Sequence, residues 1–408
     1  MALSSRAGVV VALGTAQTLA WASSYYLLAV LAVPMAKDLG TSVPTVFGAF
    51  SAALLVSAFA GPHSGRAIDR WGGRPVLMAS NLAFALGLAG LGLARGPAGL
   101  FAAWGLIGVG MASGLYEAAF AALVRLYGRD SRNVITGIAL IGGLASTLGW
   151  PLSAWLESVV GWRGACFAWA ALHVLLALPL NWSLPRVAPA VDGAVPGKVS
   201  ELPASPRTSA AVLRTSILLA AFYALTWFIS TAMAAHLPRL LMFSGATMGA
   251  AVAVGALIGP AQVAGRLLEL GFLRRVHPLV SARLGAILQP LGALALAIAG
   301  APAAIAFAVL HGAGNGILTI AKGTLPLFLF GAQGYGLRQG LLTVPARIAQ
   351  ASAPWLFGIC LDRWHADALW ISAGLGIASV AILFFLRGST SKPAAPPVAQ
   401  NESSPAAS

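Results

Sequence analysis

Long apolar runs, separated by short polar segments, fill almost the whole of this 408-residue chain. A helix needs about 20 apolar residues to cross the hydrocarbon core of a bilayer. The runs are continuous rather than alternating in polarity, which favours helices over the strands of a membrane barrel. We therefore predict an all-α membrane protein with twelve transmembrane helices. The predicted spans are residues 9–34, 44–61, 75–94, 99–124, 134–156, 164–184, 215–237, 245–265, 278–299, 302–328, 338–360 and 367–386.

Composition and cysteine usage agree with this prediction. Hydrophobic residues make up 58% of the chain and the mean hydropathy is +0.84, more apolar surface than a water-soluble globule of this size can bury. Both cysteines, Cys166 and Cys360, lie in predicted spans. They indicate neither a disulfide framework nor a metal cluster. No metal ion or other cofactor is therefore expected.

The distribution of basic residues predicts the orientation in the membrane. The formal net charge is +14, but only five of the 25 Lys and Arg residues fall in the loops of one side. Cytoplasmic loops carry the excess of Lys and Arg in membrane proteins. We therefore place both termini in the cytoplasm, expect the bacterial inner (plasma) membrane, and need no nucleic acid to explain the basic charge. The five residues are Lys37, Arg95, Arg163, Arg239 and Arg363.

Two polar segments divide the chain. Residues 185–214 contain five prolines and scattered basic residues without an apolar period, which is typical of a flexible linker. The tail is rich in Pro, Ser and Ala, a composition that predicts disorder. We predict an N-terminal six-helix half over 1–184, a cytoplasmic linker over 185–214, a C-terminal six-helix half over 215–386 and a disordered cytoplasmic tail over 387–408.

A dense polar cluster, Gly61 to Arg74, interrupts the apolar pattern and recurs in the second half. The cluster has the sequence G-P-H-S-G-R-A-I-D-R-W-G-G-R, and its charges place it at the membrane surface. A displacement of 200 residues, about half the chain, indicates a duplicated protein with pseudo-symmetric halves. The matching residues are Gly65, Arg66, Asp69 and Arg74 in the first copy and Gly265, Arg266, Glu269 and Arg274 in the second.

This cluster resembles the signature loop G-x-L-A-D-R-x-G-R-K between helices two and three of the major facilitator superfamily (MFS). The residues that carry the resemblance are Gly65, Asp69, Arg70, Gly72 and Arg74, whereas Gly73 replaces the first basic residue of the closing pair. The resemblance implies a transporter that works by alternating access, with helices one, four, seven and ten around a central cavity. It carries no information about the substrate.

The resemblance also implies that the two clusters latch one conformation shut. We expect Asp69 to accept hydrogen bonds from a neighbouring helix N-terminus or to pair with an arginine. A simple topology anchor is the alternative. The predicted latch residues are Gly65, Asp69, Arg70, Arg74, Gly265, Arg266, Glu269 and Arg274.

Glu117 is the only acidic residue well inside a predicted span. An intramembrane carboxylate is costly unless it is protonated, paired or hydrated, so it is a functional candidate by default. We predict that Glu117 carries a coupling proton, and that Ser113, one helical turn earlier, shares its face. A permanent ion pair is the alternative for Glu117.

Polar and aromatic stripes mark the other helices that the resemblance places around the cavity. His311, Asn315 and Lys322 follow a helical spacing in one span, and Arg347 lies midway through the next. Lys322 could instead extend to the surface, His311 could be an ordinary hydrogen-bonded histidine, and the aromatic residues could serve helix packing. The predicted substrate-binding residues are Gln17, Trp21, Tyr25, Ser113, Tyr223, Trp227, His311, Asn315, Lys322 and Arg347.

Two intramembrane cations, Lys322 and Arg347, against one acid leave an excess of positive charge that an anionic substrate can neutralise. We therefore predict a proton-coupled secondary transporter of a small organic anion such as a carboxylate. The expected partners are this substrate, protons and the lipid bilayer, and we expect a monomer. Proton-driven efflux of a drug or other xenobiotic is the alternative, and a non-transporting membrane sensor is an alternative of a different class. No arrangement typical of an enzyme is present.

Overall fold

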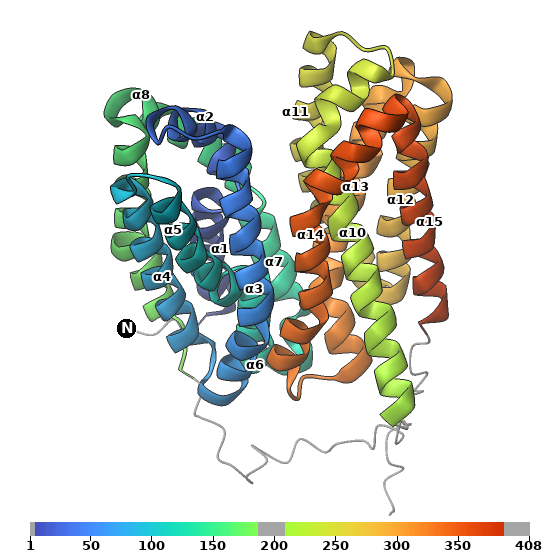
Figure 1. Cartoon of the computed structure of the whole chain (residues 1–408). Helices are drawn as coiled ribbons and strands as arrows, with labels where there is room; N and C mark the ends of the chain where they lie inside the picture. The colour runs from blue at the N-terminus through green and yellow to red at the C-terminus, as the bar shows by residue number, and fades with distance from the viewer. Residues whose placement is uncertain (1–4, 187–208, 387–408) are drawn as a thin grey trace, which may run out of the picture.

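A computed structural model of the chain describes residues 5–186 and 209–386. The described residues form helices and no β-strand. Figure 1 shows two helical bundles side by side, one for each half of the chain. The first bundle contains α1 (Arg6–Ser23), α2 (Leu28–Asp38), α3 (Val43–Trp71), α4 (Gly73–Leu93), α5 (Pro97–Gly114), α6 (Tyr116–Tyr127), α7 (Arg132–Gly142), α8 (Ala145–Leu172) and α9 (Leu178–Trp182). The second contains α10 (Ser209–Phe243), α11 (Met248–Gly271), α12 (Pro278–Ala299), α13 (Ala304–Phe330), α14 (Tyr335–Trp364) and α15 (Ala368–Phe385).

The all-helical membrane fold is confirmed. Within the described ranges, nine helical stretches are long and apolar enough to cross a membrane. All twelve predicted spans fall on these nine stretches. Three predicted spans share the 86-residue stretch Pro97–Trp182, and two share the 51-residue stretch Tyr335–Phe385. In the longer stretch, Gly161 has a φ of 70° and turns the chain between two predicted spans.

The predicted linker and tail fall largely outside the described residues. The tail over 387–408 lies entirely outside them, as does most of the linker. The predicted C-terminal end of the linker is wrong, because α10 begins at Ser209 rather than near residue 215. Ala210, Ala211 and Leu213 are good helix formers with no proline after them before the span, so the helix extends to this point.

The polar cluster Gly61–Arg74 is helical over most of its length, and not a loop. Helix α3 continues through Trp71, and the chain leaves the helical conformation only at Gly72, whose φ is 85°. A positive φ of this size suits glycine, which lacks a Cβ. Gly65 and Asp69 therefore lie four residues apart on α3, near its C-terminal end, and Gly72 ends the helix.

Three of the predicted continuous helices of the first half are broken. The first span divides into α1 and α2 around Tyr25, the fourth divides into α5 and α6 at Leu115, and the fifth divides into α7 and α8 at Gly143. Leu115 has an extended backbone, with φ −84° and ψ −172°. Breaks at membrane depth are tolerated where protein surrounds them or a cavity lies beside them.

The two bundles pack most closely where α3 meets α14. Gly61 lies against Gly340, and Gly65 lies against Gly336, backbone to backbone. The C-terminal end of α3 and the N-terminal end of α14 lie at the lower end of the molecule in Figure 1, where the bundles adjoin, whereas the ribbons diverge toward the upper end. We call the lower end the motif end, because the Gly61–Arg74 cluster lies there. Small residues permit this approach of two helix backbones.

The Gly65–Gly336 contact predicts the effect of a larger residue. A Cβ on Gly65 would overlap the Gly336 backbone, so Gly65→Val should prevent α3 and α14 from closing. Ala118 lines a small cavity between α3 and α14, beside Gly65 and Gly336. In a background with both cysteines replaced by serine, Ala118→Cys should then react with a membrane-impermeant maleimide at least about tenfold faster. Gly105→Val is the matched control, since no atom lies within 4 Å of the added Cβ. Equal labelling of the two glycine variants would contradict the prediction.

Candidate functional site

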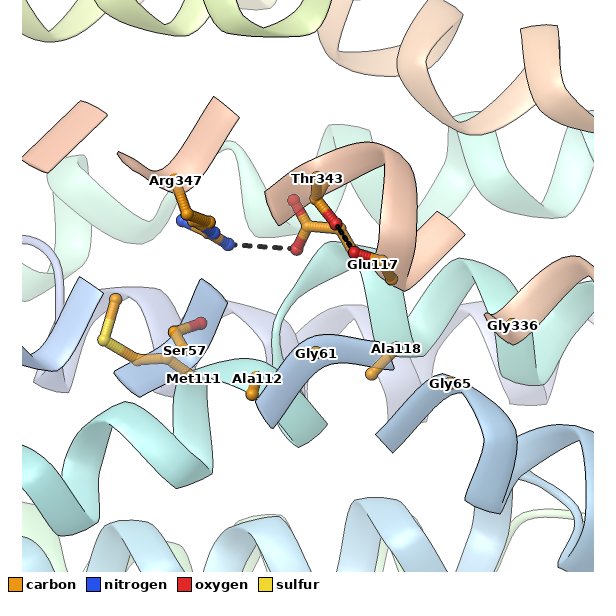
Figure 2. A pocket seen from close by; sticks show the side chains of 11 residues that line it. Ser57, Gly61, Gly65, Met111, Ala112, Glu117, Ala118, Gly336, Thr343 and Arg347 are labelled. Carbon is orange, nitrogen blue, oxygen red and sulfur yellow. Dashed lines mark hydrogen bonds and ion pairs between the residues drawn. The ribbon is translucent and has the colours of Figure 1, made fainter. Parts of the chain in front are cut away.

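An ion pair between the two halves forms the centre of the site. Arg347 of α14 donates from its NH2 nitrogen to Oε2 of Glu117 in α6, over 3.1 Å (Figure 2). The Arg347 side chain is 4% exposed and the Glu117 side chain is 16% exposed. Glu117 lies in the first turn of α6, directly after the break at Leu115, where the helix dipole favours a negative charge. In this conformation Glu117 is therefore paired, the alternative that we had left open for it.

A chain of hydrogen bonds extends from this pair across the interface. Arg347 donates to the Gln350 Oε1 over 2.9 Å, and the Gln350 Nε2 donates to the Tyr25 hydroxyl over 2.9 Å. The Tyr25 hydroxyl lies 3.3 Å from the Thr231 Oγ1. The chain thus passes from α6 through α14 to the α1–α2 break and on to α10. Our predicted site omitted Gln350 and Thr231, although Gln350 follows Arg347 by three residues and so shares its helix face.

Trp227 lies between two cationic side chains. Its ring centroid is 4.7 Å from the Lys322 Nζ and 4.6 Å from the Arg347 Cζ. Both contacts have the geometry of a cation–π interaction. Across the described part of the chain, the Lys322 ammonium has no hydrogen bond and no ion pair. The charge of Glu117 is thus matched by Arg347, and Lys322 has no acidic partner of its own among the described residues.

Trp21 and Gln17 place unsatisfied polar atoms beside this centre. Trp21 packs on Tyr25 and Tyr116, with ring centroids 5.4 Å and 5.1 Å away, and its indole Nε1 has no hydrogen-bond partner among the described residues. The Gln17 Nε2 donates to the Gly114 carbonyl at the α5–α6 break over 2.6 Å, whereas its Oε1 has no partner in the same part of the chain. Buried polar atoms without partners are rare in folded proteins, so these atoms are candidates to bind a ligand.

Four other predicted substrate residues direct their polar groups to partners within their own half of the chain. They are Ser113, Tyr223, His311 and Asn315. The Tyr223 hydroxyl donates to the Lys322 carbonyl over 2.5 Å, and Ser113 donates to Val109 over 2.7 Å. The prediction that Ser113 shares a helix face with Glu117 is wrong, because α5 ends at Gly114 before α6 begins.

His311 and Asn315 belong to a separate polar cluster in the second half. Asn315 accepts from Gln289 over 3.0 Å and donates to Ser230 over 2.9 Å. His311 is 1% exposed, lies 3.4 Å from Asn315 and stacks on a phenylalanine ring. The structure therefore does not bring these two residues to the Glu117–Arg347 pair.

The acidic residues of the two repeated clusters each reach the opposite half. Asp69 accepts from the backbone N–H groups of Gly336 and Leu337, over 2.9 and 2.8 Å, at the N-terminus of α14. This is one of the two arrangements that we had expected for Asp69. Glu269 accepts from Arg132 of α7 over 2.9 Å, and also from the Ser281 hydroxyl. Our predicted set omitted Arg132, which no spacing in the sequence relates to Glu269.

The remaining cluster residues are not equivalent between the two copies. Arg70 lies over the adjacent Trp71 ring, with its Cζ 5.9 Å from the centroid, and Arg74 donates to a carbonyl at the end of α9 over 3.4 Å. Gly65 faces the other half, whereas Gly265 packs on Ala313 of α13 in its own half. Gly265 thus packs within its own half, and its predicted role in the latch stays a prediction. Arg266 is buried, and the side chain of Arg274 lies outside what the structure describes.

The burial of the ion pair predicts a non-additive effect on stability. Arg347→Gln should destabilise the purified protein by about 3–5 kcal/mol, because it leaves the Glu117 carboxylate without a partner. Adding Glu117→Gln to this variant should recover much of the lost stability. Thermal unfolding of the wild type, the two single variants and the double variant measures this coupling. Arg239→Gln is the control, because its partner Asp362 is 61% exposed and such pairs contribute about 0–1 kcal/mol. Strictly additive losses at Arg347 and Glu117 would contradict the coupling.

Comparisons with known proteins identify the family. A model of the Major Facilitator Superfamily matches residues 13–302. The human organic anion transporter MFSD10 is similar in structure, with a TM-score of 0.68 and 15% identity over 93% of this chain and 100% of that chain. The transporter FucP in its outward conformation has a TM-score of 0.72 and 15% identity, over 92% and 97% of the chains. The proton:xylose symporter XylE has a TM-score of 0.72 and 12% identity, over 93% and 95%.

A curated relative is less informative. An uncharacterized 38 kDa protein of Thermoproteus tenax is 31% identical over 157 residues, which are 38% of this chain. The chain thus spans about two fifths of the length of this relative, 41%. The match to the family model covers well over half of the present sequence, and the solved structures share its fold. The chain belongs to the Major Facilitator Superfamily, a family of membrane transporters.

Proposed function

We propose that this protein transports a small organic anion, such as a carboxylate, in a proton-coupled alternating-access cycle. The observation that carries the proposal is the placement of Lys322 beside the Glu117–Arg347 pair, with Trp227 shared between the two cations. The pair is electrically balanced, whereas a protonated Lys322 would add a positive charge at a partly buried position. An anionic substrate would offset that charge at little cost, and a cationic one would add to it.

Glu117 is the proposed proton carrier. Protonation of its carboxyl would remove the charge that holds Arg347 and would release the guanidinium to bind the substrate anion. A cavity of about 20 Å³ touches Glu117, with walls formed by residues of α3, α5 and α14. This volume is roughly enough for one water molecule, through which a proton can reach the carboxyl. Proton and anion would then bind in the same half-cycle.

The contacts at the motif end are the proposed latch. Asp69 on the N-terminus of α14 and Glu269 on Arg132 would hold this end closed while the other end admits substrate. We place the motif end and both termini in the cytoplasm of a bacterial inner membrane, which makes the described conformation outward-facing. The likeness to FucP in its outward conformation supports this assignment.

The named relatives support the proposal to different extents. FucP of E. coli and XylE are sugar symporters that use protons, and MFSD10 is an organic anion transporter. At 12–16% identity these likenesses concern the fold. The proposed anionic substrate therefore rests on the side chains of this chain.

Neutralising Lys322 tests the proposal. In proteoliposomes with an inward proton gradient, we expect uptake of at least one radiolabelled carboxylate from a panel of acetate, benzoate and succinate. Lys322→Gln should lower this uptake at least about tenfold, because the bound anion loses its unmatched cation. Lys37→Gln, at the far end of α2, is the matched control and should leave uptake unchanged.

Two results would contradict this function. Uptake of no anion by the wild-type protein, together with efflux of an organic cation or neutral amphiphile that survives Lys322→Gln, would favour drug efflux instead. Flux of none of these compounds would favour a non-transporting sensor.

A further inference from the structure

Arg266 of α11 has a position that neither the latch nor the ion pair explains. It belongs to the second repeated cluster, yet it is 5% exposed. Its guanidinium lies against Gly143, where α7 ends and α8 begins, so that a Cβ on Gly143 would overlap the Arg266 NH1. The side chain therefore passes from the second half into the first, toward a broken helix.

Arg266 has no counter-charge in the described part of the chain. It forms no hydrogen bond or ion pair there, and its Nε is buried without an acceptor. Glu269, three residues after Arg266 in α11, is already engaged by Arg132 and Ser281, and Glu117 is engaged by Arg347. A buried guanidinium without a partner is among the most costly groups that a folded protein can hold. A protein keeps such a costly group where the group binds a ligand.

The surroundings of Arg266 favour an acceptor as that ligand. Its charge is close enough to act electrostatically on Tyr26 and Tyr116. Trp21 packs on both tyrosines, with ring centroids 6.5 Å and 5.1 Å away, and its indole N–H finds no acceptor within residues 5–186 and 209–386. A guanidinium and an indole N–H are hydrogen-bond donors only, whereas the Tyr116 hydroxyl already donates to the Ala139 carbonyl over 3.4 Å. An oxyanion supplies the acceptors and the negative charge that Arg266 and Trp21 lack.

We propose that Arg266 binds the carboxylate of the transported anion, in a subsite formed with Trp21 at the α7–α8 break. This inference rests on the proposed function and adds a second guanidinium, besides that of Arg347, that binds the anion. A guanidinium can bind both oxygens of a carboxylate at once, whereas the Lys322 ammonium acts as a point charge. Because Arg266 comes from α11 and Trp21 from α1, the bound anion would connect the two halves of the protein.

A structural role for Arg266 is the competing explanation. The guanidinium lies near the C-terminal end of α7, where a positive charge can stabilise the helix dipole. The two roles differ in their effect on the ligand-free protein. A helix cap would make Arg266→Gln less stable than wild type, whereas an anion site would make the variant equally or more stable, because a costly buried charge has been removed.

The test combines stability and binding in detergent-purified protein. Thermal unfolding of wild type, Arg266→Gln, Arg266→Lys and Arg275→Gln is measured with sodium acetate, benzoate or succinate, and with choline chloride as the comparison. A ligand that binds the native state raises the unfolding temperature in proportion to its affinity. We expect at least one carboxylate to stabilise wild type and Arg275→Gln, an exposed arginine nearby. Arg266→Gln should bind that carboxylate at least about tenfold more weakly, and Arg266→Lys should be intermediate.

Three results would overturn the site. The first is unchanged carboxylate binding in Arg266→Gln, and the second is that no carboxylate stabilises the wild type. The third is a ligand-free Arg266→Gln protein that is less stable than wild type, together with an Arg266→Lys protein that has the stability of the wild type. If Arg266→Gln does not fold, retention of full carboxylate affinity in Arg266→Lys also overturns the bidentate site.

Flux assays separate this inference from the proposed function. Carboxylate uptake that Arg266→Gln leaves intact would remove the subsite and keep the transport proposal. Carboxylate binding that depends on Arg266, in a protein that moves no carboxylate across a vesicle membrane, would keep the subsite and remove the transport proposal.

Discussion

A buried ion pair, Glu117 with Arg347, is the interaction on which the arrangement of the two halves depends. In a medium of low dielectric constant neither charge can remain alone, so α6 and α14 are held together as long as both are ionised. A proton can neutralise Glu117, and a substrate anion can take the place of Glu117 beside Arg347. The pair therefore supplies a physical reason for proton binding, substrate binding and movement of the halves to influence one another.

The broken helices of the first half place this chemistry. The breaks at Tyr25, Leu115 and Gly143 lie beside the hydrogen-bond chain, Glu117 and Arg266 respectively. Each break exposes helix ends that a continuous helix would conceal, and discontinuous helices are a common way to build a site within a membrane. In the second half the equivalent helices α10, α13 and α14 are continuous. Helix α13 contributes Lys322 and α14 contributes Arg347, whereas α10 contributes the Trp227 ring that both contact.

The sequence predicted the fold well because hydrophobic run length is a direct physical requirement of the bilayer. It also predicted that Asp69 has a helix N-terminus within reach, since the resemblance placed it at the end of α3. It did not predict that Glu117 pairs with Arg347, because the two residues are 230 positions apart and no periodicity links them. The breaks at Leu115 and Tyr25 carry no proline, so continuous helices were expected there. The separation of His311 and Asn315 from the site arises from packing inside the second half, which a helical stripe cannot reveal.

Proton movement through Glu117 is the central claim, and a pH-sensitive dye trapped in proteoliposomes tests it most directly. An inward gradient of the carboxylate that the protein transports should acidify the lumen of wild-type vesicles. Glu117→Gln should abolish this acidification while exchange of labelled for unlabelled carboxylate continues, because Arg347 then remains free to bind the anion. Acidification that persists in Glu117→Gln would contradict the assignment of the coupling proton to this residue.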